Sequence, residues 1–182
     1  GNILTHGPQL NMNYYFDEKL RKTDHETILN YLITFRNKAT FSPVLMHDYV
    51  QVLFPFDPTN SGKDSVQLGS KHWWKTIGAD FVSKPQSLFN YGFSLRYGGY
   101  YEDGKKLTIS GNAGYRFQPY LNITMTASYN DLLLPMPWGH TTFWLIGPKV
   151  DLTMTNKLYF TTYIQYNQQL NNTNVNARFQ WR

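Results

Sequence analysis

The chain has 182 residues, which is the size of one domain. Aromatic residues make up 17% of it and charged residues only 16%, whereas soluble domains typically carry about 25% charged residues. The formal charge of +5 comes from scattered lysines and arginines, which argues against a nucleic-acid-binding surface, and the absence of cysteine excludes disulfides and thiolate chemistry.

Apolar and polar residues alternate in the first half of the chain. Residues 10–16 and 29–35 place an aromatic or aliphatic side chain at every second position. Successive side chains of a strand point to opposite faces, so this pattern predicts strands with one apolar face. Less regular strands are expected over residues 44–53 and 74–83.

The second half repeats the alternation more regularly. In residues 89–97 every odd-numbered residue is aromatic or leucine, and every even-numbered residue is small or polar. Further strands are expected over residues 107–118, 121–130, 144–154, 158–167 and 174–182. The chain thus has about ten expected strands, and about 9–11 tilted residues are enough for a strand to cross a bilayer.

The links between these strands alternate in length. Short links contain residues 41–43, 83–86, 117–119 and 155–157. Longer or more charged links cover residues 17–26, 55–72, 101–106, 132–141 and 168–173. Outer-membrane barrels have short turns at the periplasmic rim and longer loops at the outer rim. We therefore expect an all-β fold over residues 1–182, an antiparallel transmembrane β-barrel whose ten or so strands are part of a larger barrel.

A soluble β-sandwich is the alternative, because its strands alternate in the same way. The polar face here consists mostly of Asn, Thr, Ser, Gln and Gly, whereas a soluble sheet turns Lys and Glu outward. Strands of about ten residues also exceed the usual soluble length of about 5–6. Many aromatic residues lie near strand ends, as in the girdles of membrane barrels. These features favour the membrane barrel.

Charged residues within the expected strands share the polar face. An Arg or Lys on the lipid face near the midplane costs about 2–4 kcal/mol, so a barrel would turn these side chains into its lumen. The residues predicted to face the lumen are Arg36, Asp80, Arg96, Arg116, Lys149, Asp151 and Arg178. They predict either a basic lumen that favours anionic solutes or, as the preferred interpretation, ion pairs and hydrogen bonds that stiffen the wall.

No catalytic, cofactor or metal-binding pattern is recognisable. The five histidines lie far apart in the sequence and lack the spacing of metal ligands: His6, His25, His47, His72 and His140. Phosphate-binding loops and nucleophile elbows are absent. We therefore expect no enzyme, no cofactor and no metal, and a membrane-embedded hydrolase is the least favoured function. Trp73 and Trp74 after the long link are candidate sugar contacts, although interfacial anchoring is the preferred interpretation.

The C-terminal half resembles a particular Bacteroidota family. The resemblance rests on residues 130–135, on residues 156–167 and on residues 176–182. Its most specific element is Gln-Tyr-Asn at positions 165–167, followed by Asn176, Arg178 and Trp181. Members of this family join a periplasmic domain, similar to family-nine carbohydrate-binding modules, to a C-terminal β-barrel of unknown function.

The resemblance implies an outer-membrane location and a link to glycan binding or uptake. Family members continue beyond the Trp-Arg position into a final strand, and they carry the carbohydrate-binding-like domain. This sequence includes neither of these parts, so we expect this chain to be the later part of a longer barrel. The expected function is an outer-membrane pore or scaffold, and the alternative is a non-transporting component of a larger outer-membrane complex. The expected partners are outer-membrane lipid, other outer-membrane proteins and a glycan, with no nucleic acid.

Overall fold

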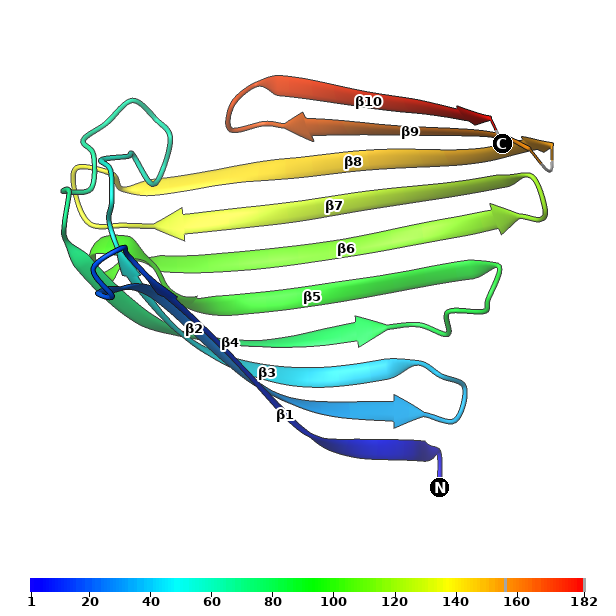
Figure 1. Cartoon of the computed structure of the whole chain (residues 1–182), viewed down its shortest axis with the longest axis horizontal. Coiled ribbons are helices and arrows are strands. Elements are labelled where there is room, and N and C mark those ends of the chain that lie inside the picture. Colours follow the sequence, from blue (N-terminus) through cyan, green and yellow to red (C-terminus); the bar gives the residue numbers. More distant parts are fainter. Residues whose placement is uncertain (156, 182) are drawn as a thin grey trace.

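The computed structural model describes residues 1–155 and 157–181, and it is all-β. Ten strands form one antiparallel sheet in the order β1 to β10, so each strand pairs with its neighbours in the sequence (Figure 1). The expected ten-stranded antiparallel sheet is therefore confirmed. Asn156 of the expected link 155–157 and Arg182 of the expected strand 174–182, both of which belong to the family motifs, lie outside the described residues.

The strands are long, with 10 to 16 residues each. Their bounds are β1 Ile3–Phe16, β2 Lys22–Phe35, β3 Thr40–Gln51, β4 Lys71–Val82, β5 Phe89–Gly99, β6 Lys105–Phe117, β7 Leu121–Leu133, β8 His140–Thr155, β9 Leu158–Asn167 and β10 Asn172–Trp181. A short 3₁₀ turn, η1 (Tyr101–Asp103), follows β5. Within the described residues, no helix combines the length and the apolar composition needed to cross a bilayer.

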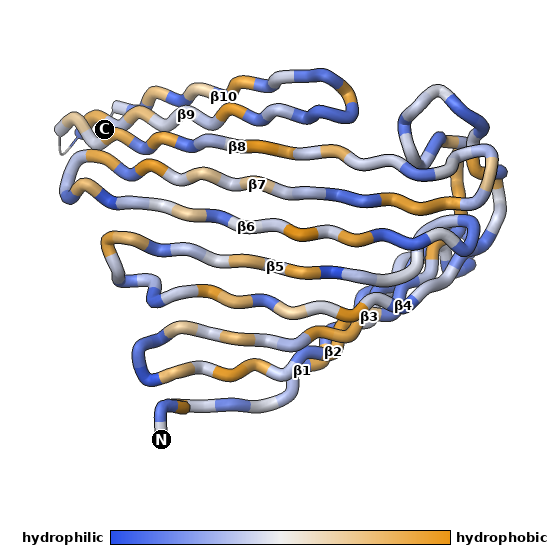
Figure 2. The backbone as a smooth tube through the Cα atoms, turned by 180° about the vertical axis from the view of Figure 1, so that it is seen from behind, coloured by the Kyte–Doolittle hydropathy of each residue, from blue (hydrophilic) through white to orange (hydrophobic). Residues whose placement is uncertain are grey.

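The register places like residues opposite one another across the sheet. Leu95 of β5 faces Ile109 of β6, and Ser94 faces Ser110. The apolar residues of neighbouring strands therefore share one face, where pairs such as Phe81 and Phe93 stack with ring centroids 5.6 Å apart. Figure 2 shows the resulting change of hydropathy from residue to residue along the strands.

The link between β2 and β3 differs from the expectation. Residues 41–43 were expected to form a turn, but Pro43 lies within β3 opposite Ala79 of β4. The turn lies at residues 36–39, where Lys38 has a φ of 68° and the side-chain oxygen of Asn37 accepts a hydrogen bond from the Ala39 N–H. Pairing of β3 with β2 is interrupted between Val44 and Phe41, so the missing N–H of Pro43 breaks no ladder bond there.

The sheet curls, and its two faces differ in exposure (Figure 1). The apolar side chains lie on the convex face without a covering layer: Phe93 is 51% exposed and Ile123 is 41% exposed. The polar residues between them are less exposed because the curl brings them close together. The arrangement is the opposite of a soluble sandwich, in which the apolar face would be buried.

The sheet is not closed, so the expected barrel is not established by the fold alone. Strands β1 and β10 are its two edges, and each pairs on one side only. A small apolar core does form, but it lies at the rim that carries the long links rather than between two layers. It consists of Val52, Val66, Leu132, Leu134 and Trp138.

Candidate functional site

The concave polar face is the candidate site, and small side chains line its centre. Ser94, Ser110 and Ser128 face one another in a row across β5, β6 and β7. Asp80 of β4 continues the row on one side, because it pairs with Ser94. These residues, together with Tyr163 of β9, line a hollow of about 440 Å³.

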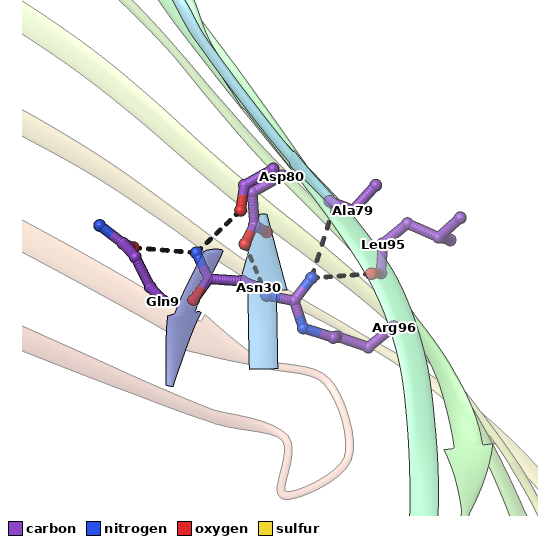
Figure 3. A network of polar contacts seen from close by, with 7 residues as sticks. Gln9, Asn30, Ala79, Asp80, Leu95 and Arg96 are labelled. Carbon is purple, nitrogen blue, oxygen red and sulfur yellow. Dashed lines mark hydrogen bonds and ion pairs between the residues drawn. The ribbon is translucent and has the colours of Figure 1, made fainter. Parts of the chain in front are cut away.

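An ion pair between Asp80 and Arg96 lies beside this hollow (Figure 3). The Nη2 of Arg96 donates to Oδ2 of Asp80 over 2.8 Å, and its Nη1 donates to the carbonyl oxygen of Leu95 over 2.8 Å. Arg96 faces Gly78 across the strand pair. A Cβ atom at position 78 would lie 2.1 Å from the carbonyl oxygen of Leu95 and 2.8 Å from Cδ of Arg96, so the glycine leaves room both for the β5 backbone and for the arginine side chain that reaches Asp80.

A chain of amide and hydroxyl groups extends the network toward β1. The Nδ2 of Asn30 donates to Oε1 of Gln9 and to Oγ of Ser42, over 3.0 Å in each case. Figure 3 shows Gln9 and Asn30 beside the Asp80–Arg96 pair. Ser42 faces Asp80 across the β3–β4 pair, so two sets of polar contacts lie next to each other on the concave face, one joining β1 to β3 and the other joining β4 to β5.

A second ion pair lies on the concave face between β7 and β9. The Nζ of Lys149 lies 3.0 Å from Oδ2 of Asp151, two positions further along β8. Asp151 also accepts hydrogen bonds from Nδ2 of Asn122 over 3.3 Å and from Oγ1 of Thr161 over 2.9 Å. Both ion pairs neutralise charge and hold side chains in place on the concave face.

The remaining predicted lumen residues lie apart from these two pairs. Arg116 of β6 donates a hydrogen bond from Nη2 to the carbonyl oxygen of Pro85 at the short-turn rim. Arg178 pairs with Thr161 and is exposed on the edge strand β10. Arg36 follows the end of β2 and is exposed in the turn, so strand alternation does not assign its side chain to either face.

An acidic group on the concave face was missed because β2 begins earlier than expected. Glu26 of β2 faces Asp48 of β3, and Asp24 is two positions away on the same face. These carboxylates line a second hollow, of about 540 Å³, near the long-link rim. The concave face is therefore acidic at this end, which does not favour anionic solutes.

Trp73 and Trp74 do not form a shared stacking surface. Trp73 lies on the convex face and is 67% exposed. Trp74 lies on the concave face, with its ring 5.1 Å from that of Tyr101 and 6.0 Å from that of Tyr100. Consecutive residues of a strand point to opposite faces, which explains the separation.

The long link of residues 52–70 is folded and crosses the rim. The carboxylate of Asp57 accepts hydrogen bonds from the N–H groups of Thr59, Ser61 and Lys63. Partial burial would raise the pKa of Asp57, but these bonds outweigh it and lower the pKa to about 2. Far along the sequence, Nε1 of Trp138 donates to the Asp64 carbonyl oxygen over 2.5 Å.

The histidines form no recognisable metal site. Among the described residues, no group of three or more His, Asp or Glu side chains could hold a metal ion. The register nevertheless brings two of the five together, because Nε2 of His25 lies 3.2 Å from Nδ1 of His47. Sequence spacing alone could not reveal this contact between neighbouring strands.

Comparisons with known proteins add no relatives. A scan against protein-family models and searches of curated proteins and of solved structures each found no match for this chain. The resemblance to the Bacteroidota barrel family therefore stays a prediction, and the function is argued from the geometry of this chain.

Proposed function

We propose that the chain is part of the wall of an outer-membrane β-barrel, with its convex face in lipid and its concave face lining a water-filled lumen. The observation that carries the proposal is the division between the two faces. Large apolar side chains such as Phe93 and Ile123 are exposed on the convex face, and the concave face holds ion pairs and hydrogen bonds. Hydrocarbon is the solvent that suits the first face, and water suits the second.

Strand length supports the same proposal. A tilted strand of about 9–11 residues crosses a bilayer. The strands here have 10 to 16 residues, which is longer than most strands of soluble sheets. Aromatic side chains such as Tyr129 and Trp144, whose ring centroids are 5.1 Å apart, lie near strand ends, where barrels carry interfacial girdles.

The proposal requires the sheet to be closed by further strands. Unpaired backbone groups in hydrocarbon cost several kcal/mol each, so open edges are not stable within a bilayer. The free sides of β1 and β10 are two such edges. Additional strands pair with both edges in the assembled barrel, which is wider than ten strands.

The charges that line the proposed lumen favour an open pore over a binding site for anions. Its central charges are neutralised within the pairs Asp80–Arg96 and Lys149–Asp151. Its long-link end carries the carboxylates of Asp24, Glu26 and Asp48. A non-transporting role within a larger outer-membrane complex is the second candidate, and the free edges of β1 and β10 favour it because they can pair with another protein.

Cysteine accessibility tests the central claim directly, because the natural chain has no cysteine. Single Phe93→Cys and Ser94→Cys variants are reconstituted in vesicles and treated with a membrane-impermeant maleimide. Labelling is expected at position 94 and not at position 93, since one faces water and the other lipid.

The pair Asn122→Cys and Ile123→Cys repeats the test on β7, and urea-unfolded samples control for thiol reactivity. Equal labelling of both positions in each pair, or labelling of the apolar position alone, would contradict a lipid-facing convex face. Recovery of the barrel from native membranes without other proteins would disfavour the second candidate.

A further inference from the structure

The convex face carries its lysines at one rim. Lys71 and Lys75 at the start of β4, together with Lys105 at the start of β6, occupy apolar-face positions beside the long links. Within the described residues, no Lys or Arg of a strand lies on the convex face toward the short-turn rim, because Arg116, Lys149 and Arg178 point to the other face. This asymmetry is unexpected for a face that otherwise suits hydrocarbon.

Three further groups extend this basic area across β2 and β3. The Nζ of Lys22 lies 3.0 Å from Nδ1 of His25, and Nε2 of His25 lies 3.2 Å from Nδ1 of His47. A lysine ammonium can only donate, so the chain of bonds runs from Lys22 to His25 to His47 and places a hydrogen on Nε2 of each imidazole. His47 in turn faces Lys75 across the β3–β4 pair.

Aromatic rings surround Lys22 and the two imidazoles. The His25 ring stacks on Tyr14 at 5.3 Å and on Tyr49 at 5.6 Å, and Nζ of Lys22 lies 4.3 Å from the Tyr49 ring centroid. Trp73 faces Tyr49 across the strand pair and is exposed. We call Lys22, His25, His47, Trp73 and Lys75 the rim patch.

The lysines of the rim patch lack acidic partners. Among the described residues, no carboxylate forms an ion pair with Lys22 or Lys75, whereas Arg96 and Lys149 on the concave face are each paired with an aspartate. Lysines gathered without an ion-pair partner attract an anion from outside the protein. The exposed tryptophan and tyrosines belong at the boundary between lipid and water.

We propose that the rim patch binds the phosphate of an anionic lipid in the outer leaflet, such as lipid A. This inference rests on the proposed function, because the long links of a barrel lie at the outer rim and the rim patch then lies at headgroup depth. The ammonium groups of Lys22 and Lys75 reach the phosphate by snorkelling, and the Nε2–H of His47 donates to its oxygens. Trp73 and Tyr49 contact the adjoining acyl and sugar parts.

Native mass spectrometry of the full chain in detergent micelles tests the proposal with two probes, phosphorylated lipid A and the same lipid after removal of its phosphates. The wild-type chain is expected to retain the phosphorylated form preferentially. One basic residue near an anionic headgroup increases the affinity about fivefold. The double variant Lys22→Ala with Lys75→Ala removes two such residues and should therefore weaken retention by about tenfold or more. The conservative Lys22→Arg with Lys75→Arg should restore it.

Lysines of the opposite rim provide the matched control. Lys84→Ala with Lys157→Ala removes the same charge from the short links and should leave lipid A retention unchanged. Equal retention of the two lipids by the wild-type chain, or equal losses in both double variants, would overturn the proposal.

Flotation with vesicles separates this inference from the proposed function. A chain that floats with vesicles but shows no preference for phosphate would leave the barrel intact and contradict the rim patch. A chain that prefers phosphorylated lipid A in micelles but does not float would support the rim patch and contradict the barrel.

Discussion

Two glycines of the concave face determine where long side chains can lie. A Cβ atom at position 147 would lie 2.9 Å from the hydroxyl oxygen of Tyr163, and one at position 78 would lie 2.8 Å from Cδ of Arg96. In both cases the missing side chain makes room for a larger neighbour that crosses the strand. Glycine on this face therefore serves packing rather than turn formation, because neither residue has a positive φ.

Gly78→Ala tests this role at a single position. The added methyl group displaces Arg96 from Asp80 and meets the Leu95 carbonyl oxygen, so the free energy of unfolding should fall by about 1–3 kcal/mol. Urea unfolding in detergent micelles measures the change. Gly7→Ala is the matched control, since a Cβ at that glycine meets no atom within 4 Å. An equal loss in both variants would show that glycine flexibility, and not the Arg96 side chain, is responsible.

At the scale of the element, the long link of residues 52–70 is held by its own hydrogen bonds and by contacts with two other links. Val66 is 0% exposed and donates its N–H to the Phe56 carbonyl oxygen, while Asp57 organises the preceding turn. Contacts with Trp138 and with Gln169, which donates from Nε2 to the Thr59 carbonyl oxygen over 2.6 Å, tie the link to the β7–β8 and β9–β10 links.

The carboxylate of Asp57 gives this link a pH dependence. Its pKa of about 2 lies below the usual 3.8, so the stabilisation is complete above about pH 4 and is lost as the pH falls through about 2. The protection of the Thr59 and Val66 amides against hydrogen exchange, relative to the intrinsic rate at each pH, should fall over that interval. Asp57→Asn should show fast exchange already at neutral pH, and Asp64→Asn in the same link should not. Protection factors that stay constant between pH 4 and pH 2 would contradict the role of Asp57.

Strands were predicted more accurately from the sequence where the pattern that indicates them lies within a single segment. Residues 89–97 and 121–130 were predicted well because strict alternation is visible within one strand. The β2–β3 turn was placed wrongly because Pro43 resembles a turn residue, and only the interrupted pairing with β2 makes room for it within β3. The Asp80–Arg96 pair and the His25–His47 contact depend on register between strands, which no single segment encodes.

At the scale of the whole molecule, the long-link rim and the short-turn rim differ in structure. The small apolar core and the folded link occupy the first rim, whereas the second has tight turns such as residues 118–120. In the proposed barrel, the link would narrow the outer mouth of the lumen, since it runs from β3 to the ends of β8 and β9.

Shortening the link tests this arrangement. Replacing residues 57–64 with a short Gly-Ser segment removes the contacts with Trp138 and Gln169, so the single-channel conductance in planar bilayers should rise while vesicle flotation is retained. A Gly-Ser replacement of residues 84–87 at the opposite rim is the control and should leave the conductance unchanged. Unchanged conductance after shortening of the long link would show that the link does not narrow the mouth.

The connection of every strand to its sequence neighbours also determines how such a chain can assemble. Each hairpin brings together residues that are near in the sequence, so the sheet can grow one hairpin at a time with little loop-closure entropy lost at each step. The contact between Gln169 and Thr59 joins residues 110 positions apart. It can form only after the intervening strands are in register, so in the proposed barrel it would report a late stage of assembly.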